Sequence, residues 1–165
     1  MKPKATVKTG TTRGGKMKTF SEIRAHMPKG AHVRVGVLAG SGDHDGISMI
    51  ELAAIHEFGS PAANIPERSF IRSTFARTDI VDGLNRQAAA LARAIVAGKL
   101  TADVALGRIG AWAAAQIKGT IRNKMTEGPE DQALKPATIA RKKSSTPLVD
   151  TGRLLGAISW LVKGS

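Results

Sequence analysis

The chain has 165 residues, of which 42% are hydrophobic and 4% aromatic, and it contains neither Cys nor Tyr. This length allows one domain with a core built from Ala, Ile, Leu and Val, while the absence of Cys excludes disulfides and thiolate metal sites. The formal net charge of +12 indicates an anionic partner, such as nucleic acid or an acidic protein surface.

Residues 1–30 are expected to form an extended basic arm. The stretch 1–19 is mostly Lys, Thr and Gly, so the isolated arm is expected to be disordered and to become ordered on assembly. No apolar stretch follows it, so we expect no secretory signal. No run approaches the roughly 20 apolar residues that a bilayer span needs. We therefore expect a chain made in a cytoplasm, without membrane contact, and with one domain over residues 31–165.

A strand with one buried face is predicted over residues 32–38, HVRVGVL. Its three valines alternate with Arg34 and Gly36, and this period of two is typical of a strand. The following stretch AGSGDHDG, residues 39–46, is rich in turn formers and is predicted to be a loop.

A short, well-buried helix is predicted over residues 49–58. Ser48 and Glu51 have the spacing of a capping box at its start. Gly59 occupies the position of a C-terminal cap, so an irregular loop bounded by prolines is expected to follow.

Two long helices are predicted next. A helical pattern runs from Glu67 to Ala97 and would span roughly 45 Å if it were continuous, with Gly83 as a point where it can kink. Thr101 is a suitable cap for the second helix, whose apolar stripe fades near Met125.

The C-terminal part is predicted to return to the sheet. Residues 126–147 are polar, and the chain then recovers with one helical turn through Leu155. Ile158, Trp160 and Val162 alternate after it as a final strand. The expected fold is α+β: a small antiparallel or mixed sheet, shared by two sequence-distant strands and packed with two long helices.

The adjacent His56 and Glu57 suggest a reactive pair, but neighbours on a helix point about 100° apart. A metalloprotease helix needs a second His four positions later, where this sequence has Ser60. The loop 36–42 lacks the Lys-Ser/Thr ending of a P-loop, and 43–45, DHD, is typical of a mobile polar loop. We therefore expect no enzyme, cofactor or metal; a hydrolase that uses His56, Glu57 or the DHD stretch is the alternative.

Several segments share a pattern: VRVGVLAGS (33–41), IHEFGSP (55–61), IPERSFIRSTF (65–75) and LKPATIARKK (134–143), which leads into PLVDTGRLLGAISWLV (147–162). Together they resemble the neck, tail-completion or virion-morphogenesis proteins of tailed bacteriophages. In such proteins a His-Glu-Phe-Gly turn precedes an Ile-Pro-x-Arg-x-Phe segment, and an Asp-Thr-Gly-x-Leu turn follows a Thr-x-x-x-Lys segment. In many tail-completion relatives the Asp-Thr-Gly segment comes first, whereas here it comes last, which suggests a branch with a rearranged order.

The resemblance implies a structural virion protein without catalytic residues. Such a subunit forms a homo-oligomeric ring, a hexamer or dodecamer, that joins the portal–connector assembly to the tail around the DNA channel. Its implied partners are copies of itself, connector or adaptor proteins, and tail tube or terminator proteins, with non-specific proximity to genomic DNA; assembly takes place in the host cytoplasm. A tail terminator ring that caps the tail tube is one alternative, and a sequence-independent nucleic-acid-binding protein is another.

The sequence also indicates which residues set the turns and which lie at interfaces. The arginines of the Ile-Pro-x-Arg segment, about one helical turn apart, can bond to Glu57 or to a neighbouring subunit. The turn residues are Gly59, Pro66, Asp150, Thr151 and Gly152. The expected interface residues are Glu57, Arg68, Arg72, Arg141, Lys142 and Lys143.

Overall fold

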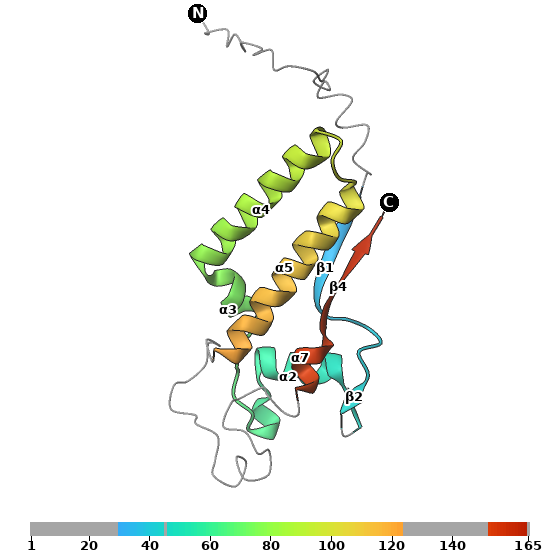
Figure 1. Cartoon of the computed structure of the whole chain (residues 1–165). Coiled ribbons are helices and arrows are strands. Elements are labelled where there is room, and N and C mark those ends of the chain that lie inside the picture. Colours follow the sequence, from blue (N-terminus) through green and yellow to red (C-terminus); the bar gives the residue numbers. More distant parts are fainter. Residues whose placement is uncertain (1–29, 45, 124–151, 165) are drawn as a thin grey trace, which may run out of the picture.

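The computed structural model describes residues 30–44, 46–123 and 152–164 (Figure 1). The fold is α+β, as predicted. An antiparallel sheet of β1 (His32–Val37) and β4 (Ile158–Lys163) packs against the long helix α5 (Ala102–Arg122), and α4 (Thr78–Val96) packs on α5. The arm over 1–29, the polar stretch 126–147, and both Asp150 and Thr151 lie outside the described residues.

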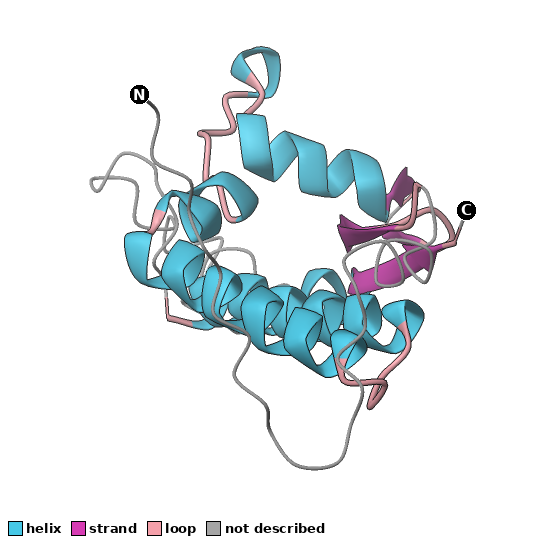
Figure 2. Ribbon diagram, turned by 90° about the horizontal axis from the view of Figure 1, so that it is seen from above, coloured by secondary structure: helices cyan, strands magenta, loops and turns pink. Residues whose placement is uncertain are grey.

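The two strands come from distant parts of the sequence, as predicted. Their register places Val35 opposite Trp160 and Val37 opposite Ile158. Ile158 is buried in the core, and the two valines pack against it as partly buried neighbours. Figure 2 shows the strands gathered at one side of the molecule, with the helices forming the remainder.

The predicted loop after β1 contains a small hairpin, which the turn-rich composition did not reveal. Its strands are β2 (Asp43–His44) and β3 (Ile47–Ser48), paired antiparallel. Helix α2 (Met49–Phe58) follows and is capped as predicted, because the Ser48 hydroxyl accepts a hydrogen bond from the Glu51 amide at 3.2 Å. A short 3₁₀ helix, η1 (Pro61–Ala63), lies in the proline-bounded loop.

The helical pattern predicted over 67–97 is not one continuous helix. The chain forms α3 (Ile71–Ala76) and then α4, separated at Arg77, which has an extended ψ of 125°. The break allows Phe70 and Ile80, on either side of it, both to be buried while α3 and α4 each contact α5. Gly83, the predicted kink, instead lies inside α4, where a Cβ atom would be 3.0 Å from the Trp112 ring of α5.

Helix α5 begins as predicted, since the Thr101 hydroxyl accepts a hydrogen bond from the Val104 amide at 3.3 Å. At the other end of the chain, Gly152 has a left-handed φ of 72° and precedes α7 (Arg153–Ala157), which leads directly into β4. The core lies where α2, the start of α3, α5 and α7 meet the sheet. Its buried members are Met49, Ala53, Phe70, Ala114, Ile117, Ile121, Leu154 and Ile158.

Candidate functional site

The carboxylate of Glu57 lies at the corner where α2 ends and α3 begins. The residue is only 5% exposed. Its oxygens accept hydrogen bonds from the amides of Phe70, Ile71 and Arg72 at 2.8–2.9 Å, and from the Ser69 hydroxyl at 2.8 Å. The first amides of a helix have no partner within that helix, so Glu57 supplies the missing acceptor for α3 across a gap of more than ten residues.

Arg72 encloses the same corner from outside. Its Nε lies 3.3 Å from Oε1 of Glu57, and its Nη2 donates to the Glu57 carbonyl at 2.8 Å and to the Glu67 carboxylate at 2.5 Å. Its guanidinium also lies 5.2 Å from the centre of the Phe58 ring, a cation–π distance. The arginine that bonds Glu57 in this structure thus belongs to the same chain.

The electrostatics of the corner keep Glu57 ionised. Burial alone would raise the pKa of this carboxyl, but the hydrogen bonds from Ile71, Arg72, Ser69 and Phe70 together lower the pKa below its ordinary value of 4.5. A general base needs a pKa near the working pH and access to a proton. Glu57 has neither, so this corner is suited to holding the backbone in place.

The stability that Glu57 provides is expected to depend on pH. Because its folded pKa lies below the unfolded value, the contribution is complete above about pH 4.5 and is lost as the pH falls through the folded pKa. In urea unfolding from about pH 6 to about pH 3, the stability difference between the wild type and Glu57→Gln should therefore shrink. A difference that stays constant over this range would contradict the prediction.

The predicted turn residues around this corner are structural. Gly59 has a left-handed φ of 74°, and a Cβ atom there would lie 2.9 Å from the Glu67 amide nitrogen, so only glycine fits without strain. Pro66 does not start a helix as predicted, because α3 begins at Ile71. The intervening residues 66–70 are not helical, and the Arg68 amide donates to the His56 carbonyl at 2.8 Å.

The structure separates the remaining candidates for chemistry. His56 is half-buried on α2, whereas its neighbour Glu57 is buried. Over residues 30–44, 46–123 and 152–164, no group of three or more His, Cys, Asp or Glu side chains is arranged to hold a metal ion. Of the predicted interface residues, Arg68 and Arg72 stay predictions, and the basic run 141–143 lies outside the described residues.

Sequence reasoning missed a set of buried hydroxyls beside the corner. The Thr74 hydroxyl on α3 donates to the Phe70 carbonyl at 2.6 Å and lies 2.7 Å from the Thr120 hydroxyl on α5. The Ser73 hydroxyl likewise bonds the Ser69 carbonyl. The only sequence signal is the spacing of four between each hydroxyl and its carbonyl, a pattern that exposed helices share.

Comparisons with known proteins add no relative. Neither the family models, nor the curated proteins, nor the solved structures contain a match to this chain. Among the helices of the described residues, none is both long enough and apolar enough to cross a membrane.

Proposed function

We propose that this protein is a structural subunit of a tailed-bacteriophage virion, forming a ring in the neck that joins the connector to the tail. The observation that carries the proposal is that the described parts of the family-like segments lie together in the fold. The first segment supplies β1, which pairs with β4 and contacts α7, both from the last segment. Helix α2, whose C-terminal part belongs to the second segment, contacts β1 and α7. Glu57 of the second segment then caps the helix of the third.

The surface of the protein supports a role in assembly. Helix α2 exposes Ile50 and Phe58, which are 47% and 66% accessible, while β4 exposes Trp160 and Leu161. Exposed apolar side chains of this size mark interaction sites when they gather. In a ring of identical subunits, one surface of each subunit contacts a different surface of its neighbour. The exposed residues of α2 and those of β4 lie on different elements, as two such surfaces require.

The charge and the corner chemistry agree with the same role. A net charge of +12 favours proximity to DNA in a channel or to acidic neighbouring rings. In the segment IHEFGSP, Glu57 caps a helix. This role in holding the backbone suits a subunit with a structural function. A tail terminator ring is the alternative in the same class.

Electron microscopy of particles assembled without this protein would test the proposal. If the protein joins heads to tails, we expect DNA-filled heads beside finished but unattached tails. Overlong tails would instead identify a terminator, because tail growth would lack its stop. Complementation with the wild-type chain is the control and should restore joined particles.

Normal, infectious particles made without the protein would overturn both versions of the proposal. The complementing chain should also be tested as Ile50→Asp with Phe58→Asp. Both side chains are exposed, so the variant is expected to fold yet to fail in joining if α2 is an assembly surface.

A further inference from the structure

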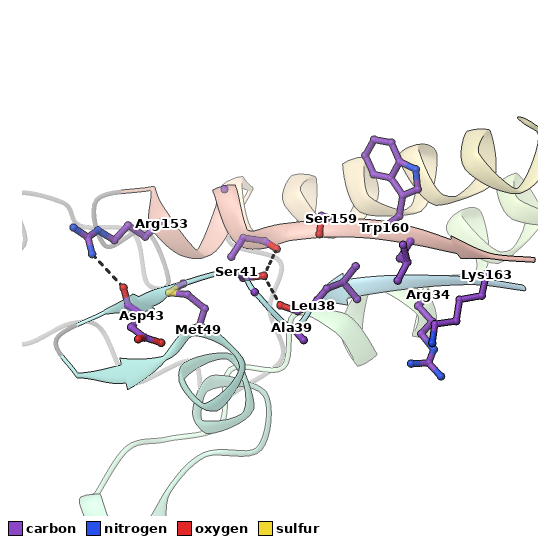
Figure 3. Close-up of a pocket in the computed structure, with 14 residues that line it drawn as sticks. Arg34, Leu38, Ala39, Ser41, Asp43, Met49, Arg153, Ser159, Trp160 and Lys163 are labelled. Atoms are coloured by element: carbon purple, nitrogen blue, oxygen red, sulfur yellow. Dashed lines mark hydrogen bonds between the residues drawn. The ribbon is translucent and has the colours of Figure 1, made fainter.

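An open groove of about 770 Å³ lies beside the sheet (Figure 3). It is lined by residues of β1, β4 and α7, by the loop that follows β1, and by the starts of β2 and α2. Arg34 and Lys163 project to one side of the sheet, whereas Trp160 projects to the other side, where it meets Gly110 of α5. The residues that line the groove include neither Glu57 nor the residues that bond to its carboxylate, so the groove is separate from the Glu57 corner.

Positive charge is concentrated along this groove. Arg34 lies opposite Leu161 in the register and His32 lies opposite Lys163, so Arg34 and Lys163 are diagonal neighbours on one face. Like charges that share one face of a sheet repel each other, and an anion bound between them would offset that repulsion. Within the described residues, neither of the two forms an ion pair.

The other end of the groove is also positively charged. Arg153 of α7 lines it, and its Nη1 lies 3.4 Å from the backbone carbonyl of Asp43 rather than from a carboxylate. Asp43 is the single acidic residue among the fourteen that line the groove, against three basic ones. The lining thus carries an excess of positive charge that the described part of the chain does not neutralise.

The lining of the groove also includes apolar side chains. Leu38, Met49 and Leu161 line the groove together with Ala157. Met49 belongs to the core, so this part of the lining has a fixed position, while Leu161 is half exposed. A ligand that fills the groove therefore has to present apolar groups as well as negative charge.

We propose that this groove binds an acidic segment of a partner protein, with carboxylates at Arg34, Lys163 and Arg153 and an apolar side chain against Leu38. Charge complementarity selects this occupant. The chain's own arm over 1–19 is basic and would be repelled. Duplex DNA presents phosphates but no side chain for the apolar lining, and its backbone contacts come chiefly from cationic and polar groups.

Selection from a random library of 12-residue peptides, with the purified full chain as target, tests this inference. We expect the enriched peptides to combine Asp or Glu with at least one large apolar residue. Binding of the best peptide, measured by fluorescence anisotropy, should weaken roughly tenfold or more in Arg34→Glu with Lys163→Glu. Replacing the acidic residues of the peptide with Asn or Gln should weaken binding similarly.

The matched control is Lys99→Glu with Arg108→Glu, which makes the same change in net charge at exposed residues outside the groove. We expect it to retain binding within a few-fold. Equal losses in both double variants, or enriched peptides without carboxylates, would overturn the proposal. The proposal would also be overturned if duplex DNA bound more tightly than the peptide and if only the groove variant lost this DNA binding. Because the assay uses the isolated protein, its outcome is separate from that of the particle experiment.

Discussion

Replacing Glu57 with Ala is expected to lower the free energy of unfolding by about 3–5 kcal/mol, the usual cost of removing one partner from a buried charged network. The substitution removes an acceptor shared by the Phe70, Ile71 and Arg72 amides and by the Ser69 hydroxyl. A buried donor left without an acceptor costs about 1–3 kcal/mol. Water can reach some of these groups, which keeps the total below the simple sum. Urea denaturation followed by circular dichroism measures the effect.

Two further variants distinguish the effect of losing the Glu57 hydrogen-bond network from the effect of losing a negative charge alone. Glu57→Gln keeps the shape of the side chain but turns one acceptor into a donor that faces amides, so a loss of about 2–3 kcal/mol is expected. Glu67→Ala removes a carboxylate that is 44% exposed and bonds Arg72, and should cost at most about 1 kcal/mol. Equal effects for Glu57→Ala and Glu67→Ala would show that the corner contributes no more than a surface ion pair.

The elements predicted correctly are those whose signals are local in sequence. The alternation of apolar residues indicated β1 and β4, and the cap residues Ser48 and Thr101 marked the starts of α2 and α5. Each signal depends on a side chain and the backbone within a few residues of it. The pairing of the two strands followed because each has one face that needs burial.

What was not predicted depends on contacts between distant residues. The amides that Glu57 caps lie more than ten positions away and carry no side-chain signature, so the sequence suggested only that Glu57 pairs with Arg68, Arg72 or a neighbouring subunit. The break at Arg77 was missed because the residues on both sides keep a helical pattern. Trp160 indicated a strand, but its contact with Gly110 of α5 required the register of helix against sheet.

That contact makes Gly110 the glycine of α5 with the least room. A Cβ atom there would lie 2.6 Å from Cδ1 and 2.8 Å from Cβ of Trp160. The ring can tilt, but the Trp160 Cβ moves only with the backbone of β4. Gly119, in the same helix, would place a Cβ atom with nothing within 4 Å. The two glycines thus differ in surroundings while sharing the same secondary structure.

Gly110→Ala and Gly119→Ala are therefore expected to have effects of opposite sign. Alanine is favoured over glycine inside a helix by about 0.5–1 kcal/mol, so Gly119→Ala should stabilise the protein by up to this amount. Gly110→Ala should destabilise it by about 2–3 kcal/mol, because overpacking forces β4 away from α5. In a Trp160→Gly background, which removes the Cβ as well as the ring, the penalty at position 110 should disappear, which gives a coupling energy of about 2 kcal/mol or more in a double-mutant cycle. If Gly110→Ala stabilised the protein as Gly119→Ala does, helix α5 would not approach β4 as closely as the structure places it, and the groove on the other face of that strand would lose its fixed support.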